Sequence, residues 1–335
     1  MISTSFYTTL IPKSFDTMAT ESNDEVVHPN RVVSERIGKI TASLSTSEQR
    51  YILEGCRDDC RVDGRRRMEL RPFTILATDP IIMSHGSSRI FVQQTHVVCS
   101  IKAELVHPAS HQPTQGAIEI HVDSLMQDSR KRRQTEQQLQ SALTYLLADH
   151  IVGMEGLCVV PNQYVWKLNV DLVILSAKQG SVIDVCSRAI RAALLNTKLP
   201  NLTPLNTKQE SRGAQVDLSV DSDIQKASTP KGASECPIII TVSVLKCPPK
   251  GAPVLLLDLT LDEEVCASSQ VRVAVKPNGQ VCAVLFQGGS LPLGMLPDVT
   301  STAVQASNAV FEVMKGTILD DITPQTLLRE QFQIR

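Results

Sequence analysis

The sequence predicts an α+β fold built as two lobes, each combining a β-sheet with helices. Apolar and polar residues alternate over residues 72–122, and strand patterns return from residue 236 onward. In both blocks the strands and helices are segregated along the chain, which is typical of α+β proteins. The chain has 335 residues, 42% of them hydrophobic, so it is long enough for about two domains with a real core.

The N-terminal part shows no sign of a regular element. Residues 1–44 are polar, rich in Ser and Thr, and have no steady period. We therefore expect a mobile N-terminal extension. Order is predicted to begin with a helix over residues 44–55, where Ser45 and Glu48 have the spacing of a capping box.

The first lobe is predicted to span residues 45–204 and to start with strands. Period-two patterns occur in FTILAT, in SRIFVQQTHVVCSIKAEL and in AIEIHVD, and Gln93-Gln94 is expected to form a tight turn. A helix is predicted over about 134–149, because its leucines fall on one face. The strand VWKLNVDLVIL follows, and then the helix SVIDVCSRAIRAALL, which is expected to end at Asn196.

The second lobe is predicted to span residues 236–330. Residues 205–235 are polar with few large apolar side chains, so they are expected to form a connecting loop. The strands IIITVSVL and VLLLDLTL come next, followed by the hairpin VRVAVKPNGQVCAVLF. Its Asn278-Gly279 pair favours a two-residue primed turn. A helix over about 300–315 is expected to complete this lobe.

Composition excludes several classes of function. The net charge is −2 and only 4% of residues are aromatic, so the whole chain is not predicted to attract nucleic acid or to read bases by stacking. No apolar run approaches the roughly 20 residues that cross a bilayer. The nine cysteines include no C-x-x-C pair, which favours reduced thiols in the cytoplasm or nucleus. No phosphate-binding loop, dinucleotide fingerprint or hydrolase triad occurs, and we expect neither a metal ion nor a cofactor.

Several linked motifs resemble the RNase PH family. The segment ILEGCRDDCRVDGRRRMELRPF contains R-x-D-G-R at Arg61, Asp63, Gly64 and Arg65, and LDLTLDEEVCASSQVRVAV resembles the family's D-x-T-x-x-E-E segment. GSSRIFVQQTHVVCSIKAEL, PTQGAIEIHVD and VDLVILSAKQGSVIDVCSRAIRAALLNTKLP match in the same order, over roughly residues 44–320. The K-A-E motif at 102–104 favours the ring subunits of the eukaryotic RNA exosome. This resemblance implies an RNase PH-type fold, a ring of such subunits with cap subunits, and single-stranded RNA threading through the ring.

The same resemblance bears on catalysis. Active family members carry an A-D-G-G turn whose carboxylate is the candidate acid or metal ligand, whereas this chain has Ala177-Lys178-Gln179-Gly180. An ammonium group neither coordinates magnesium nor readily gives up its proton near neutral pH. Structural roles are favoured for Asp184, at a helix start, and for Asp171, which is expected to anchor a loop or the R-x-D-G-R segment. We therefore expect no enzyme activity and no catalytic residue; the alternative is a phosphorolytic 3′-5′ exoribonuclease.

Two groups of cations are candidate RNA-binding residues. The run SRKRR places Arg130, Lys131, Arg132 and Arg133 just before the predicted helix start, where the helix dipole disfavours cations unless an anion is bound. In active relatives a Gly-Arg pair here contacts phosphate, and Ser129-Arg130 is the equivalent. A solvated charge run explains the pattern equally well, and the run also matches, only weakly, a nuclear import signal. Arg66 and Arg67 are the second group, next to a turn that Arg61, Asp63 and Arg65 are expected to hold by salt bridges.

The sequence thus predicts a non-catalytic structural subunit of the RNA exosome ring. Its expected roles are rRNA processing and 3′-5′ RNA decay, with a contribution to the RNA channel. Its expected partners are other RNase PH-like ring subunits, cap subunits and single-stranded RNA, with no membrane. The expected location is the nucleus, nucleolus and cytoplasm.

Overall fold

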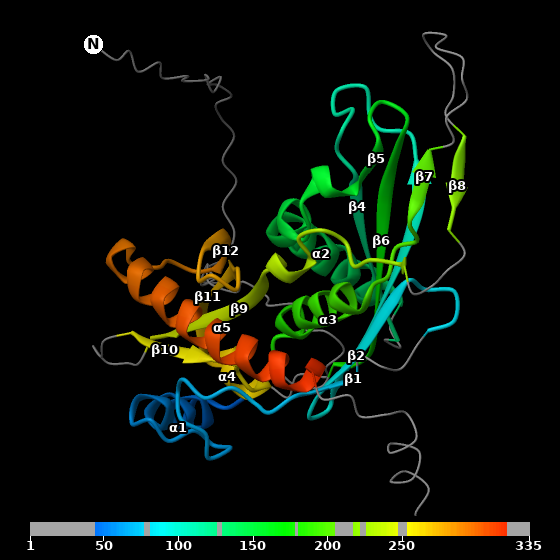
Figure 1. The fold of residues 1–335 in the computed structure, drawn as a ribbon. Coiled ribbons are helices and arrows are strands. Elements are labelled where there is room, and N and C mark those ends of the chain that lie inside the picture. Colours follow the sequence, from blue (N-terminus) through cyan, green and yellow to red (C-terminus); the bar gives the residue numbers. More distant parts are fainter. Residues whose placement is uncertain are drawn as a thin grey trace, which may run out of the picture. The chain divides into compact units, whose positions relative to one another are not determined.

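The computed structural model describes residues 44–76, 81–125, 129–177, 180–204, 217–221, 226–246 and 253–319. The predicted N-terminal extension therefore lies almost wholly outside the described residues. The predicted α+β class is confirmed, with one main sheet in each lobe (Figure 1). No helix in these ranges is long and apolar enough to span a membrane.

The first lobe contains a six-stranded sheet with the path β1-β2-β3-β6-β4 and with β5 beside β6. Its strands are β1 (Thr74–Leu76), β2 (Gly86–Val92), β3 (Thr95–Val106), β4 (Ala117–Ser124), β5 (Cys158–Val160) and β6 (Tyr164–Ala177). The predicted tight turn joins β2 to β3, and Gln93 adopts a φ of 51° there. Strand β4 runs parallel to β6, whereas the other pairs are antiparallel.

The second lobe contains a four-stranded antiparallel sheet in the order β10-β9-β11-β12. Its strands are β9 (Ile238–Leu245), β10 (Val254–Leu257), β11 (Ala267–Val275) and β12 (Val281–Gly288). All eight residues of β9 are buried, because helices cover both faces of this sheet. The shorter elements of the chain are β7 (Leu202–Pro204), β8 (Leu218–Val220), η1 (Ala148–His150), η2 (Met154–Leu157), η4 (Ala233–Glu235) and η5 (Leu293–Met295).

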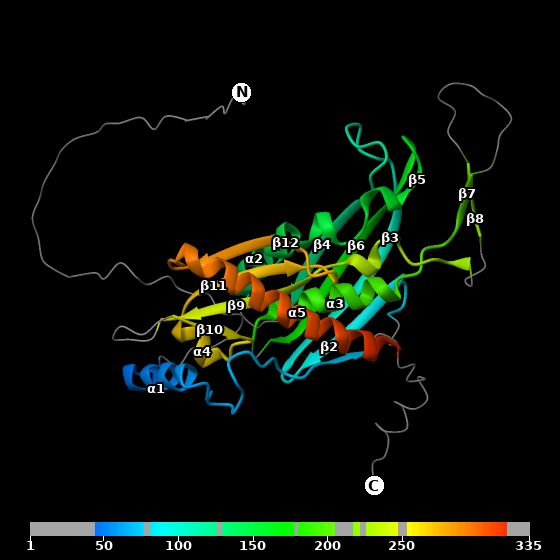
Figure 2. The same ribbon diagram turned by 60° about the vertical axis from the view of Figure 1, so that its left-hand side comes forward.

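Two helices, α2 (Ser129–Leu147) and α3 (Val182–Asn196), pack against both sheets. Every residue of α3 from Val182 to Leu194 is buried, including the polar or charged Asp184, Ser187, Arg188 and Arg191. Ser88 Oγ of β2 donates to the Ala189 carbonyl at 2.8 Å, and the Ile239 N–H of β9 donates to Ser187 Oγ at 2.9 Å. Helix α3 therefore bonds to a strand of each lobe (Figure 2).

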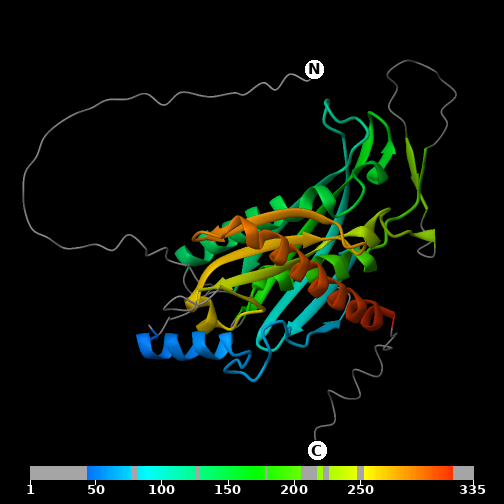
Figure 3. The same ribbon diagram turned by 90° about the vertical axis from the view of Figure 1, so that its left-hand side faces the viewer.

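Three helices complete the fold: α1 (Thr46–Arg57), α4 (Leu261–Cys266) and α5 (Leu296–Leu319). Helix α1 begins with the predicted capping box, since Ser45 Oγ accepts from the Glu48 N–H at 3.2 Å and Glu48 bonds back to the Ser45 N–H. It packs on α4 and β10, while α5 packs on β9 and β11 (Figure 3). One apolar cluster runs from the first sheet through α2 and α3 to the second sheet and α5.

Three local expectations differ from the structure. Helix α2 begins at Ser129 rather than near residue 134. The β11–β12 hairpin has a three-residue loop, because Lys276 N–H donates to Gln280 and Gly279 N–H donates back to Lys276. Only Gly279 has positive φ there, so the two-residue primed turn was wrong. The segment predicted as a connecting loop also contains β8, which pairs with β7.

Candidate functional site

Asp184 lies in the first turn of α3, where this helix meets the second lobe. Its carboxylate accepts hydrogen bonds from Thr241 Oγ1 at 2.6 Å, the Thr241 N–H at 2.9 Å and Ser181 Oγ at 3.1 Å. Burial raises the pKa of Asp184, and the charge of Arg188 and the bonds from Thr241 act in the opposite direction. Both carboxylate oxygens are thus engaged in joining α3 to β9, which supports the predicted structural role.

The turn before α3 is fixed by an arginine that reaches across to the second lobe. Gly180 has a φ of 74°, and the Arg71 guanidinium occupies the space where a side chain at this position would project. Arg71 binds the Asp258 carboxylate through Nε at 2.9 Å and through its terminal nitrogen, and its own N–H donates to Asp258 at 2.8 Å. A glycine is therefore required at 180. Lys178 and Gln179, on which the argument about catalysis depends, lie outside the described residues.

Asp171 is placed apart from this junction. It lies in the middle of β6, opposite Ser100 of β3 and His121 of β4. Its neighbours Val170 and Leu172 are buried, so Asp171 is on the other face of the sheet and is half-exposed. The R-x-D-G-R segment is held by other carboxylates, and Asp171 and Asp184 do not form a pair.

The R-x-D-G-R segment is bound to the second lobe by its arginines. Arg61 is fully buried and makes a two-point contact with Glu263, with Nε to Oε1 at 2.8 Å and Nη2 to Oε2 at 2.5 Å. Arg61 also donates to the carbonyls of Leu257 and Asp258 at 3.0 Å each. The predicted turn is confirmed, since Arg65 contacts Asp63 at 2.7 Å and Arg61 lies 4.0 Å from it.

The candidate RNA-binding cations of α2 differ in exposure and in ion pairing. Arg133 is exposed, whereas Arg132 lies 3.7 Å from Glu136, which also accepts bonds from the N–H and hydroxyl of Ser124. These residues are inside α2 and not before it, so the expected position of the run relative to the helix was wrong. The side chains of Arg130 and Lys131 lie outside the described part of the chain.

Arg66 and Arg67 are not brought to the cations of α2. Arg66 is exposed, while Arg67 binds Asp59 through its N–H at 2.8 Å and Nε at 3.2 Å. The Arg67 carbonyl accepts from the Leu257 N–H at the end of β10. Helix α2 packs beside β12, at the opposite edge of the same sheet. The two groups therefore mark two separate surfaces.

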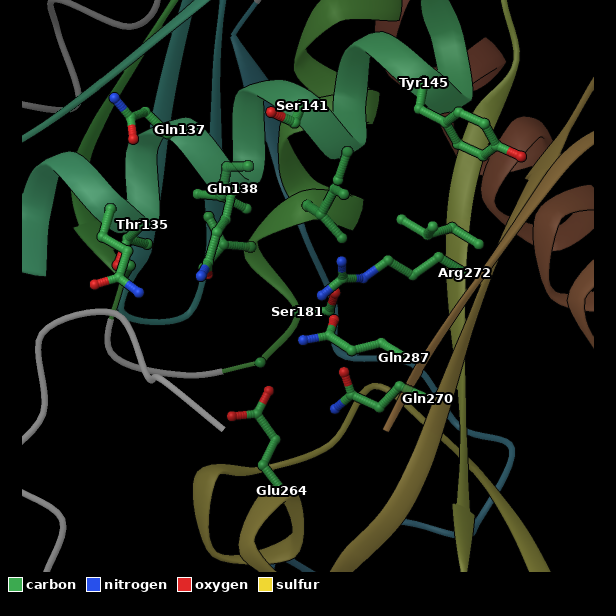
Figure 4. Close-up of a pocket in the computed structure, with 18 of the residues that line it drawn as sticks. Thr135, Gln137, Gln138, Ser141, Tyr145, Ser181, Glu264, Gln270, Arg272 and Gln287 are labelled. Carbon is green, nitrogen blue, oxygen red and sulfur yellow. The ribbon is translucent and has the colours of Figure 1, made fainter. Parts of the chain in front are cut away.

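A cavity of about 580 Å³ opens between α2, the start of α3 and the second sheet (Figure 4). Arg272 and Gln270 of β11 and Gln287 of β12 project into it from the sheet, and Glu264 of α4 lies below them. Burial lowers the pKa of Arg272, whereas Asp184 and Glu264 raise it. The facing side of α2 contributes uncharged polar side chains, namely Gln134, Thr135, Gln137, Gln138, Ser141 and Tyr145.

The cavity escaped the sequence analysis because its lining comes from four segments far apart in the chain. Among the described residues of its lining, Glu264 and Arg272 are the charged groups, and they have opposite signs. Within the described ranges, no group of three or more His, Cys, Asp or Glu residues could hold a metal ion. The glutamines at 134, 137 and 138 were the available signal, because they leave this stretch with few of the charged side chains that exposed surfaces usually carry.

Comparison with known proteins gives consistent results. Residues 69–200 match domain 1, and residues 235–307 match domain 2, of the 3′ exoribonuclease family called RNase PH. The chain is 27% identical over 251 residues to exosome complex component RRP45A of Arabidopsis thaliana, covering 73% of this chain and 77% of that protein. It is 26% identical over 283 residues to exosome complex component Rrp42 of Sulfurisphaera tokodaii, covering 82% and 95%.

Solved structures agree on the fold. A chain of an archaeal exosome core has a TM-score of 0.57 at 18% identity, covering 80% of this chain and 96% of that one. A chain of the Archaeoglobus fulgidus exosome, solved with RNA bound to the active site, has a TM-score of 0.57 at 20% identity, covering 79% and 97%. With both of its domains present in order, this chain belongs to the RNase PH family.

Proposed function

We propose that this chain is a structural, non-catalytic subunit of the RNA exosome ring, acting in rRNA processing and in 3′-5′ RNA decay. Its similarity to exosome components over 73–82% of its length supports the assembly. The state of Asp184 carries the non-catalytic assignment. A general acid must reach the leaving oxygen of its substrate, but both oxygens of this carboxylate accept hydrogen bonds that hold the lobes together.

Phosphorolysis is the competing function, and one observation favours it: Glu264 and Arg272 line a cavity next to Gly180 and Ser181. The test is incubation of the purified chain, alone and in its complex, with single-stranded RNA and inorganic phosphate. We expect no nucleoside diphosphate from this chain. Phosphate-dependent release that is lost on Glu264→Gln, with the fold retained, would establish the enzyme instead.

The cations at 130–133 and at 66–67 are the proposed RNA contacts, acting on the phosphate backbone. Exposed Arg133 and Arg66 support this role, because Arg pairs readily with phosphate. Reversing the charge at 130–133 should reduce the length of RNA that the assembled ring protects from nuclease. Lys315→Glu, at an exposed position of α5, is the matched control. If both variants protect RNA of equal length, the cations at 130–133 do not contact RNA.

The partners follow from the same proposal: other RNase PH-like ring subunits, cap subunits and single-stranded RNA. Affinity purification of the chain should recover such subunits in one particle that elutes far above 36.7 kDa. A chain that elutes as a monomer from cell extract would contradict the proposal. The proposed location is the nucleus, nucleolus and cytoplasm, and imaging of a fluorescent fusion with and without the 129–133 run would test it.

A further inference from the structure

The exposed side of α2 carries an unusual surface for a soluble helix. Its exposed residues after Arg133 are all uncharged, namely Gln134, Gln137, Gln138, Ser141, Thr144 and Tyr145. Glu136 is the acidic residue of this stretch, and it is turned to Ser124. Depletion of charge together with an exposed aromatic ring is the composition of protein–protein interfaces. Tyr145 is 64% exposed and suits the role of an anchor.

The other wall of the same groove is an open sheet edge. Strand β12 is the last strand of its sheet in the described part of the chain, with β11 as its neighbour. The Gly289 N–H donates to the Ser268 carbonyl of the strand beside it. Since hydrogen-bonding direction alternates along an antiparallel strand, the N–H groups of Gly288 and Phe286 face the open edge. Such an edge can pair with an added strand.

The charges of the groove argue against a polyanion as its occupant. Among the described residues of the cavity lining, Glu264 and Arg272 have opposite charges and the others are uncharged. Binding of RNA depends on cations that neutralise phosphates, and the described residues that line this groove carry no net positive charge. Amide side chains and unpaired backbone groups instead match the hydrogen-bonding groups of a polypeptide.

We propose that the groove between α2 and β12 binds an extended, uncharged segment of a neighbouring ring subunit. The segment pairs with the β12 edge, its side chains bond to the glutamines of α2, and the 580 Å³ cavity receives one of them. This inference rests on the proposed function, because it names the surface through which the subunit is held in its ring.

Charge insertion distinguishes a protein occupant from RNA. Gln138→Lys and Gln138→Glu should both weaken retention of the neighbouring subunit, by about tenfold, because either charge must lose its water on binding. Tyr145→Ala should weaken it by about tenfold or more. The matched controls are Gln305→Lys and Gln305→Glu, at an exposed glutamine of α5, which should leave assembly unchanged.

The readouts are subunit retention in the purified complex and hydrogen exchange at Phe286 and Gly288, which should slow on assembly. If the wild-type chain enters no ring, the proposed function itself fails. If it enters the ring, and all the groove variants enter equally well with unprotected amides, the groove assignment is wrong. Tighter RNA binding by Gln138→Lys and weaker binding by Gln138→Glu, with assembly unchanged, would also overturn it in favour of RNA.

Discussion

The arginines of residues 61–71 and the cations of residues 130–133 differ in what surrounds them. Arg61, Arg65 and Arg71 reach carboxylates of the second lobe or of their own turn, and the side chain of Arg61 is completely buried. In the second run Arg133 is exposed, and Arg132 is 3.7 Å from an acid one helical turn away. Similar runs of cations therefore join the two lobes in one segment and leave Arg133 exposed in the other.

The largest expected effect is the loss of the acid that pairs with Arg61. Glu263→Ala should lower the free energy of unfolding by about 3–5 kcal/mol, because it leaves a buried guanidinium without a counter-charge. Urea denaturation would measure it. Replacing Arg61 by Met as well should recover part of the loss. Glu312→Ala, at an exposed ion pair of α5, should change stability by less than about 0.5 kcal/mol. If Glu263→Ala and Glu312→Ala lower the free energy of unfolding equally, the buried ion pair contributes no more to stability than the exposed one.

Variants of Asp184 test whether a second buried carboxylate also stabilises the contact between the lobes. Asp184→Ala should cost about 2–4 kcal/mol of unfolding free energy, because the N–H and hydroxyl of Thr241 lose their acceptor. Asp184→Asn should cost less, since an amide oxygen can still accept one bond and no charge is buried. Thermal or urea unfolding of both variants provides the measurement. An asparagine variant less stable than the alanine variant would contradict this account.

Acid should weaken the ion pair between Arg71 and Asp258, which ties the first segment to the second lobe. Burial alone would raise the pKa of Asp258, but the hydrogen bonds and charge of Arg71 outweigh it, so this pKa lies below its usual 3.8. A carboxyl with a depressed pKa stabilises the fold above the unfolded-chain value, and this stabilisation is lost as pH falls through the folded-state pKa. Unfolding free energy should therefore drop more steeply below about pH 4 in the wild type than in Asp258→Asn. Parallel pH profiles would show that this ion pair is unimportant.

The smallest expected effect has the opposite sign. Arg130 falls in the first turn of α2, where the helix dipole disfavours a cation. Arg130→Gln should raise the free energy of unfolding by about 0.3–1 kcal/mol while reducing RNA retention by the ring. Thermal unfolding and nuclease protection on the same sample would check both. A loss of stability would mean that this residue, like Arg61, holds the fold together.

Much of the fold could be predicted from local patterns. The capping box of α1, the strands on either side of Gln93 and the limits of α3 depend on residues close together in the chain. The start of α2 was wrong because cations are unfavourable in a first helical turn, yet Glu136 stabilises this end by bonding Ser124 and Arg132. At the β11–β12 turn, a two-residue Asn278-Gly279 loop would need the N–H of residue 277 to donate to Gln280. Pro277 has no N–H, and Lys276 donates to Gln280 instead.

The candidate site could be predicted only in part. The turn of Arg61, Asp63 and Arg65 is local and was expected. Arg61 and Glu263 are 202 positions apart in the sequence, and no local pattern in either segment predicts that they pair. The cavity required knowledge of how α2 lies over β11 and β12, which depends on the packing of the whole core.

The burial of α3 between two sheets has a consequence for how the protein can be divided. Family models separate it into two domains, yet a single apolar cluster continues across that division. Either half alone would expose a large apolar surface to water. The two halves share one hydrophobic core, so neither should fold stably when grafted alone onto another protein. A force applied to one half should be transmitted to the other through this core.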